Sequence, residues 1–239
     1  MLKILAYGFP SLPLASIYFS IYVLLGEFYF KIYGLSLSSI GLIFILIRLF
    51  DAFSDPVMGY ISDNFPQKFG SRKPWVLIGG TIFIFSTWML FVPIFQSVGI
   101  SYFSFWLLIS AVGWTVAYAP YYAMGAELTF DYLERSRVTF CRELFTILGI
   151  ILASLLYSIS IDFDNKILQS GISTKAGLYQ ICIVSSFIFF ISMVFFLISN
   201  TKNKQISKAK NKNFKIFEII YSLKKQELLR RLLFSHFIN

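Results

Sequence analysis

Six long apolar runs constrain the fold of this chain more than any other feature of its sequence. Each run is long enough to cross about 30 Å of hydrocarbon as a helix. Hydrophobic residues make up 57% of the chain and charged residues only 14%, whereas a soluble domain has about 25% charged residues. Lipid offers the backbone no hydrogen-bond partner, and the runs are continuous rather than alternating, so the sequence predicts an all-α membrane protein and not a barrel. The predicted spans are residues 6–30, 38–60, 74–95, 100–124, 139–160 and 177–199.

The distribution of lysine and arginine predicts how these spans are oriented. Sixteen basic residues lie in one set of connecting segments, and only three lie in the segments that alternate with it. The richer set comprises residues 1–5, 61–73, 125–138 and 200–239. Because cytoplasmic loops carry the excess of basic residues, both termini are predicted to be cytoplasmic. Pro10 and Pro13 interrupt the first run and no small-residue cleavage site follows, so this run is expected to remain as the first helix.

The net charge of +9 is concentrated after the sixth run. Residues 201–239 hold ten basic residues and two glutamates, and their basic core, TKNKQISKAKNKN, contains no aromatic side chain. A basic segment beside a membrane helix fits attraction to anionic lipid better than nucleic-acid binding, so the expected partner is the bilayer. The predicted organisation is a six-helix bundle over 1–199, a basic cytoplasmic segment over 200–226 and the truncated start of a seventh helix over 227–239.

Two aspartates lie inside the second span, where a charged side chain costs roughly 2.5–3.5 kcal/mol on insertion scales. Helical spacing places Asp51 and Asp55 on one face together with Arg48. The opposite face, predicted to contact lipid, consists of Ile45, Leu49, Phe53 and Val57. A one-sided stripe of charges within a membrane predicts an ion site or an ion pathway. The alternative is a structural ion pair between Arg48 and Asp51, which leaves Asp55 without a local partner.

The fourth span carries a second polar stripe. Thr115, Tyr118 and Tyr122 place three hydroxyl groups on one helical face, and Pro120 loosens the helix beside them. The alternative for the two tyrosines is an aromatic belt at the membrane interface. Arg142 enters the fifth span about one turn from its start, where it either extends to the cytoplasmic surface or has a buried polar role.

The sequence contains no signature of an enzyme. It lacks the H-E-x-x-H, G-x-S-x-G and phosphate-binding loop motifs. An intramembrane aspartyl protease needs aspartates on two different helices, whereas Asp51 and Asp55 share one. Cys141 and Cys182 have no metal-ligand spacing and are predicted to pack as small apolar residues. We therefore expect no catalytic residues, no cofactor and no metal other than a coupling cation.

Two segments carry a family likeness. RLFDAFSDPVMGYISDNFPQKFGSRKPWVLIGG, residues 48–80, resembles the second helix, cytoplasmic loop and third-helix start of the glycoside–pentoside–hexuronide:cation symporters. PYYAMGAELTFDYLERSRVTFCR, residues 120–142, resembles the fourth-to-fifth helix segment of the same family, and YGFPSLPLA at 7–15 also fits. This sodium:galactoside symporter branch, which includes melibiose permease, is part of the major facilitator superfamily. The resemblance implies the N-terminal half of a major facilitator fold, placed in a bacterial inner membrane.

The resemblance also implies residue roles. The positions matching the cation-binding group are Asp51, Ser54, Asp55 and Thr115, with Arg48 as the supporting ion-pair partner. The positions implied for solute binding are Tyr118, Tyr122 and Arg142. Ala15 and Tyr118 stand where melibiose permease-like proteins have acidic residues that grip the sugar, so the cation site is kept while the galactoside grip is not.

The resemblance implies Na⁺- or H⁺-coupled symport of a sugar or glycoside-like solute, and the sequence does not choose between the two cations. Since a major facilitator half contains six helices and the substrate lies between two halves, a second half supplied by a separate chain is one alternative. A remnant that transports nothing is another, and a lysophospholipid-type symporter is a third. In each case the chain alone is expected not to transport.

Overall fold

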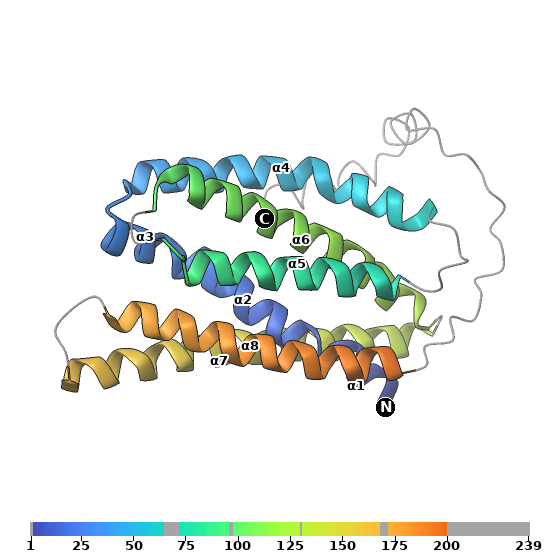
Figure 1. Ribbon diagram of the computed structural model, residues 1–239. Helices are drawn as coiled ribbons and strands as arrows, with labels where there is room; N and C mark the ends of the chain where they lie inside the picture. Colours follow the sequence, from blue (N-terminus) through green and yellow to red (C-terminus); the bar gives the residue numbers. More distant parts are fainter. Residues whose placement is uncertain (1, 65–71, 96–97, 130, 168–171, 200–239) are drawn as a thin grey trace. The chain divides into compact units, whose positions relative to one another are not determined.

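The computed structural model describes residues 2–64, 72–95, 98–129, 131–167 and 172–199. Within these ranges every regular element is an α-helix, which confirms the predicted fold class (Figure 1). The helices are α1 (Leu2–Gly8), α2 (Ser11–Val23), α3 (Leu25–Tyr33), α4 (Leu37–Asn64), α5 (Lys73–Phe91), α6 (Ile100–Glu127), α7 (Tyr132–Ile167) and α8 (Ile172–Ile198). The predicted basic segment over 200–226 and the predicted seventh helix over 227–239 lie outside the described residues.

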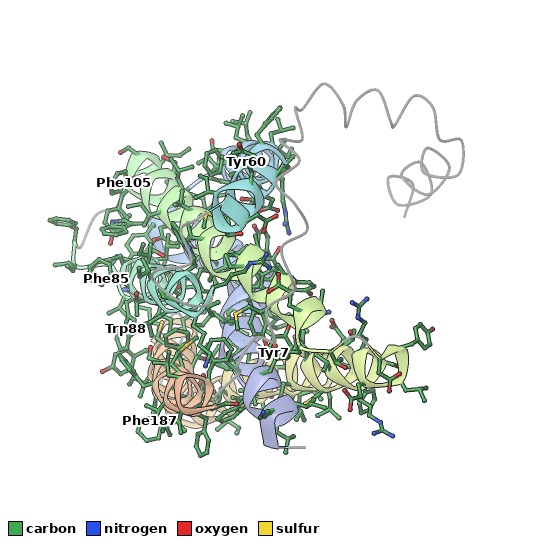
Figure 2. All side chains as sticks on the ribbon, turned by 90° about the vertical axis from the view of Figure 1, so that its right-hand side faces the viewer. Tyr7, Tyr60, Phe85, Trp88, Phe105 and Phe187 are labelled. Atoms are coloured by element: carbon green, nitrogen blue, oxygen red, sulfur yellow. The ribbon has the colours of Figure 1, made fainter. Side chains whose placement is uncertain are left out.

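Six segments of the described chain are long and apolar enough to cross a membrane, as the sequence predicts. They are Lys3–Val23, Leu37–Asp63, Lys73–Phe91, Ile100–Glu127, Tyr132–Ser160 and Lys175–Ile198. Many large apolar side chains on these segments point outward, including the labelled Phe85, Phe105 and Phe187 in Figure 2. On α4 the predicted lipid face is also exposed, from 55% at Leu49 to 76% at Phe53. Outward apolar surface on this scale fits lipid as its surroundings.

The single helix predicted over 6–30 is divided into α1, α2 and α3, and Pro10 and Pro13 account for the break between α1 and α2. Pro13 has no N–H to bond the Phe9 carbonyl, so the Leu12 amide bonds that carbonyl instead, at 3.1 Å, and the chain turns between α1 and α2. A pair of reciprocal bonds holds this break against α6. The Tyr121 hydroxyl donates to the Tyr7 carbonyl at 2.6 Å, and the Tyr7 hydroxyl donates to the Tyr121 carbonyl at 3.1 Å.

The start of α7 also differs from the sequence prediction, which treats residues 125–138 as a charged loop before a span over 139–160. The helix already begins at Tyr132, because Asp131 caps it. The Asp131 side chain accepts a bond from the Leu133 amide at 3.2 Å, and its carbonyl accepts one from the Arg135 amide. An aspartate at a helix start is a capping signal that the sequence reasoning overlooked.

Helices α5 and α6 pack closely because glycines remove side chains from their contact. A Cβ atom at Gly79 would meet the backbone of Ala117, and one at Gly113 would lie 2.6 Å from the Phe83 amide nitrogen. Close approach of backbones through small residues is the usual way in which membrane helices associate. This contact fixes the position of α6, which carries half of the candidate site.

Replacing Gly79 with alanine is expected to lower the free energy of unfolding by about 1–3 kcal/mol, because the added methyl group overpacks the contact. The matched control is Gly41→Ala in α4, where the new methyl group meets nothing within 4 Å. Thermal unfolding of the purified chain in detergent measures both variants. Equal melting temperatures for the two would be incompatible with the close α5–α6 contact.

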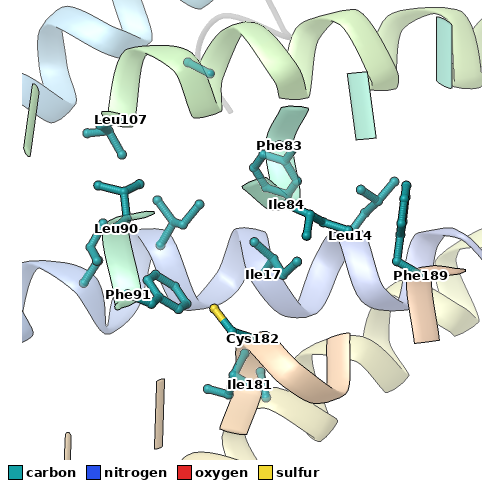
Figure 3. Packing of buried hydrophobic residues seen from close by; sticks show 14 of the residues in the cluster. Leu14, Ile17, Phe83, Ile84, Leu90, Phe91, Leu107, Ile181, Cys182 and Phe189 are labelled. Atoms are coloured by element: carbon teal, nitrogen blue, oxygen red, sulfur yellow. The ribbon is translucent and has the colours of Figure 1, made fainter. Parts of the chain in front are cut away.

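The buried core lies between α2, α5, α6 and α8. Figure 3 shows Cys182 of α8 among Ile17, Phe91 and Ile181, and its side chain is 1% exposed. Cys141 is also buried, and both cysteines are free. The prediction that they pack as small apolar residues is confirmed.

Charged side chains join the helix ends near the α4–α5 connection. Arg72 pairs with Asp63 at the end of α4, at 2.8 Å, and with Glu127 at the end of α6, at 2.9 Å. Lys73 donates to the carbonyl of Ser199 at 2.7 Å, so it caps the C-terminus of α8. These contacts tie the ends of α4, α5, α6 and α8 together at one membrane surface.

Candidate functional site

The buried stripe of α4 determines where its two aspartates lie. Ile43, Ile47 and Met58 are buried against the neighbouring helices, and Asp51 falls on the same stripe, with a side chain that is 13% exposed. Asp55 lies beside this stripe and is exposed on one side. The shared face predicted for the charges is therefore divided, with Asp51 turned toward the packed interior and Asp55 toward an open cavity.

Asp55 meets α6 through a hydroxyl group. Thr115, which is 3% exposed, donates from Oγ1 to Asp55 Oδ1 at 2.8 Å. Ser54 Oγ lies 3.4 Å from Thr115 Oγ1 and 3.4 Å from the Asp51 carbonyl oxygen. The structure thus brings together Ser54, Asp55 and Thr115. Asp55 has no local partner in the sequence, and Thr115 of α6 is the partner that the fold provides.

Asp51 has an unused acceptor. Its Oδ1 is buried and has no hydrogen-bond partner among the described residues. The side chain borders a cavity of about 10 Å³, close to the space that one water molecule needs. Ser110, Tyr22 and Trp114 also line this cavity. A buried carboxylate oxygen without a donor is costly, so it is a natural place for a cation, a proton or a water molecule.

Arg48 is held mainly by aromatic faces. Its Nη1 lies 4.0 Å from Asp51 Oδ2, the outer limit of an ion pair, and its side chain is half exposed. The guanidinium carbon lies 4.2 Å from the centre of the Tyr22 ring and 5.7 Å from that of Tyr18. A structural ion pair with Arg48 is therefore a weak account of Asp51, since the guanidinium is directed toward the two tyrosine rings.

A continuous row of aromatic rings runs from Arg48 to Arg142. Neighbouring ring centres are 4.2–4.6 Å apart, and the two contacts of Trp114 are stacked. The row consists, in spatial order, of Tyr22, Tyr18, Trp114, Tyr118 and Tyr122. The hydroxyls of its last two members lie 2.6 Å apart. The sequence reasoning singled out Tyr118 and Tyr122 and missed the other three, although Tyr18 and Tyr22 have the i, i+4 spacing of one helical face.

The far end of this row explains the position of Arg142. Its guanidinium carbon lies 3.7 Å from the centre of the Tyr122 ring, and its Nη2 pairs with Glu143 at 2.5 Å. The Arg142 side chain is only 11% exposed. Of the two alternatives for Arg142, these contacts fit a polar role within the protein and not extension to the surface.

A cavity of about 590 Å³ opens beside the row, within the size range of small-molecule sites. Asp55, Arg48, Trp114 and Tyr118 all border it. Ala15, at the position where related proteins are expected to have an acidic residue, also lines it. Tyr122 and Arg142 are not among its lining residues, so of the three residues implied for solute binding only Tyr118 reaches this cavity.

Comparison with known proteins identifies a family of transporters and several symporters as relatives of this chain. The family described as MFS/sugar transport protein matches residues 6–239. The chain is 31% identical over 138 residues to the uncharacterized symporter YnaJ of Bacillus subtilis strain 168 and 28% identical over 176 residues to the inner membrane symporter YicJ of Escherichia coli K12. It is 24% identical over 217 residues to the isoprimeverose transporter of Lactiplantibacillus pentosus.

These alignments cover 56%, 71% and 88% of this chain but only 29%, 38% and 44% of the respective relatives. The aligned residues therefore cover less than half the length of each of these proteins. The family match nevertheless includes nearly every residue of the chain, and the six apolar helices show an integral, multi-pass membrane protein. The chain belongs to the MFS/sugar transport protein family.

Proposed function

We propose that the chain forms the cation-binding six-helix part of a symporter that couples Na⁺ or H⁺ to the uptake of a sugar or glycoside. The observation that carries this proposal is the meeting of α4 and α6, where Thr115 donates to Asp55 beside Ser54 and the unpartnered Asp51. Charged groups at membrane depth are expensive, and they are found where an ion must bind or pass.

The chemistry of this group suits a hard cation or a proton. Carboxylate and hydroxyl oxygens are the ligands of hard cations, and Asp51 Oδ1 has an acceptor site to offer. Within the described residues no cluster of three or more His, Cys, Asp or Glu is present. Pro56, which has no N–H, also leaves the Ala52 carbonyl of the same turn without its helical donor. The transported cation would therefore be held by oxygen atoms of α4 and α6.

The large cavity suits a sugar. Both faces of Trp114 are covered by Tyr18 and Tyr118, so a sugar ring would pack its C–H groups against the edges of the aromatic row, while its hydroxyls reach Arg48 and Asp55 at the rim. A putative glycoside/cation symporter of Escherichia coli K12 and a lactose permease of Leuconostoc lactis are further relatives of the chain. We assign the solute to the same broad class, without the acidic grip that galactoside carriers are expected to have at Ala15 and Tyr118.

In this proposal, cation binding and solute binding are coupled because the two sites share a residue. Asp55 borders the solute cavity and also belongs to the cation group, so binding of a cation changes the charge that the solute meets. Alternating access needs a second bundle that closes the cavity from the other side. The proposed activity therefore belongs to this bundle together with a second six-helix half, whether one chain or two carries them.

The proposed orientation places both termini in the cytoplasm, at the inner membrane of a bacterium. Sixteen basic residues against three favour this arrangement. In a background without Cys141 and Cys182, single cysteines at positions 166 and 208 are expected to react with an impermeant maleimide from opposite sides of the membrane. Labelling of both from the same side would require a different topology.

Gradient-driven uptake tests the proposed function. Membrane vesicles from source cells, with the gene in its natural context, are given a panel of labelled pentoses, hexoses and glycosides. Accumulation that requires an imposed Na⁺ or proton gradient, and that disappears when the gene is deleted, is the expected result. The proposal fails if deletion leaves gradient-driven uptake of every sugar unchanged.

A further inference from the structure

A second cavity lies at the end of the helices opposite Asp63 and Arg72. It has a volume of about 330 Å³ and is formed by α3, by the end of α5 and by the start of α8. In Figure 1 these three helix ends lie near one another on the left. The lining residues are Phe28, Tyr33, Phe91, Val92, Pro93, Lys175, Ala176 and Tyr179. None of them belongs to the cation group or to the aromatic row.

The depth of this cavity is that of a membrane interface. Phe91 is the last residue of one membrane-crossing segment, and Lys175 is the first residue of another. The floor is apolar, since Phe28 is fully buried and Phe91 is 2% exposed. Tyrosine and lysine side chains at such a depth lie at the level of lipid headgroups, with the hydrocarbon directly below them.

Three hydrogen-bond donors border the cavity without an acceptor in the described part of the chain. The ammonium group of Lys175 lies 5.7 Å from the centre of the Tyr33 ring and pairs with no described carboxylate. The side-chain hydroxyls of Tyr33 and Tyr179 likewise bond no described group. Burial raises the pKa of the Tyr33 hydroxyl, so this group keeps its proton and remains a donor. The neighbouring Lys31 differs, because Glu27 neutralises it at 2.5 Å.

We propose that this cavity binds the phosphate group of an anionic phospholipid, with the start of one acyl chain against Phe28 and Phe91. We infer a phosphate headgroup from charge complementarity, since Lys175, Tyr33 and Tyr179 line the same cavity. Lys175 lies in the first turn of α8, where the helix dipole also favours an anion. The apolar floor at interface depth distinguishes a lipid from a free phosphate ion, which would gain nothing from it. The site is independent of the proposed transport function.

Native mass spectrometry of the purified 239-residue chain tests this site, with dioleoylphosphatidylglycerol as the probe. One lipid is expected to remain bound per chain, and Lys175→Gln is expected to weaken its binding about tenfold, as loss of a hydrogen bond to a charged group would. Lys175→Arg should restore it. Lys31→Gln is the matched control, because it removes a positive charge from the same end of the helices without touching the cavity. It should leave binding unchanged.

Three outcomes would overturn the proposal. The first is equal lipid binding by the wild-type chain and the Lys175→Gln variant, with circular dichroism showing that both are folded. The second is equally tight binding of dioleoylglycerol, which has no phosphate, since the cavity would then be an apolar groove only. The third is displacement of the lipid by millimolar inorganic phosphate, which would identify a site for the free anion.

Discussion

Replacing Asp55 with asparagine is expected to abolish gradient-driven sugar accumulation while leaving the chain folded. Asp55 is the carboxylate that receives the Thr115 bond and borders the large cavity, so both proposed ligands meet it. Loss of a hydrogen bond to a charged group costs about 1.5–3 kcal/mol, which corresponds to a loss in cation affinity of about tenfold or more. Asparagine keeps the size of the side chain, so the Gly-mediated helix contacts are not disturbed. Uptake in vesicles with each cation gradient measures the effect.

The matched control for this variant is Asp63→Asn. Asp63 belongs to the same helix, but it pairs with Arg72 near the membrane surface and lies two turns beyond Asp55. Its replacement is expected to leave coupled uptake measurable. Asp51→Asn should behave like Asp55→Asn, because Asp51 is the other carboxylate of the proposed cation group. Unimpaired uptake by both Asp51→Asn and Asp55→Asn would remove the cation group from the mechanism.

Replacing Trp114 with alanine is expected to remove solute binding and to destabilise the bundle. Trp114 stacks on Tyr18 at 4.3 Å and on Tyr118 at 4.2 Å, and it lines both cavities beside the aspartates. Truncating a large aromatic side chain costs about 3–5 kcal/mol of stability. Trp114→Phe keeps a ring in the row and should recover most of both properties. Melting temperature and equilibrium binding of labelled sugar measure them.

Trp106→Ala is the matched control for Trp114. It removes an indole from the same helix, but Trp106 borders neither of the cavities beside Asp51 and Asp55. This variant is expected to lose stability while it retains sugar affinity. If Trp106→Ala and Trp114→Ala lowered sugar affinity equally, the aromatic row would have only a packing role.

The helices themselves could be predicted from sequence because hydropathy and length decide which segments enter a membrane. Pro10 and Pro13 signalled the break in the first span, but spacing could not show that the Tyr121 hydroxyl of α6 bonds the Tyr7 carbonyl beside it. Likewise, the early start of α7 follows from a local cap at Asp131. These hydrogen bonds depend on individual side chains, which hydrophobic periodicity does not describe.

The candidate site could be predicted only in part. Spacing along α4 placed Asp51 and Asp55 within one turn of each other, and the family likeness added Ser54 and Thr115. Spacing could not reveal that Asp51 borders a cavity of about 10 Å³ while Asp55 borders one of about 590 Å³, because this depends on the angle at which α4 packs on α6. The stacking of Tyr18 on Trp114 could not be predicted from spacing either, because it joins two helices that are distant in sequence.

The central claim is that Asp51, Ser54, Asp55 and Thr115 form a cation site, and carbodiimide modification of the purified chain tests it most directly. Dicyclohexylcarbodiimide reacts with protonated carboxyl groups in an apolar environment, and peptide mass spectrometry locates the product. We predict that Asp51 or Asp55 is modified, and that Na⁺ slows the reaction if Na⁺ is the coupling ion. Raising the pH should slow it with either coupling ion, because the reagent needs the protonated carboxyl group, and the absence of a Na⁺ effect at constant pH would then favour H⁺. Modification of neither aspartate, or modification at a rate that Na⁺ and pH both leave unchanged, would contradict the claim.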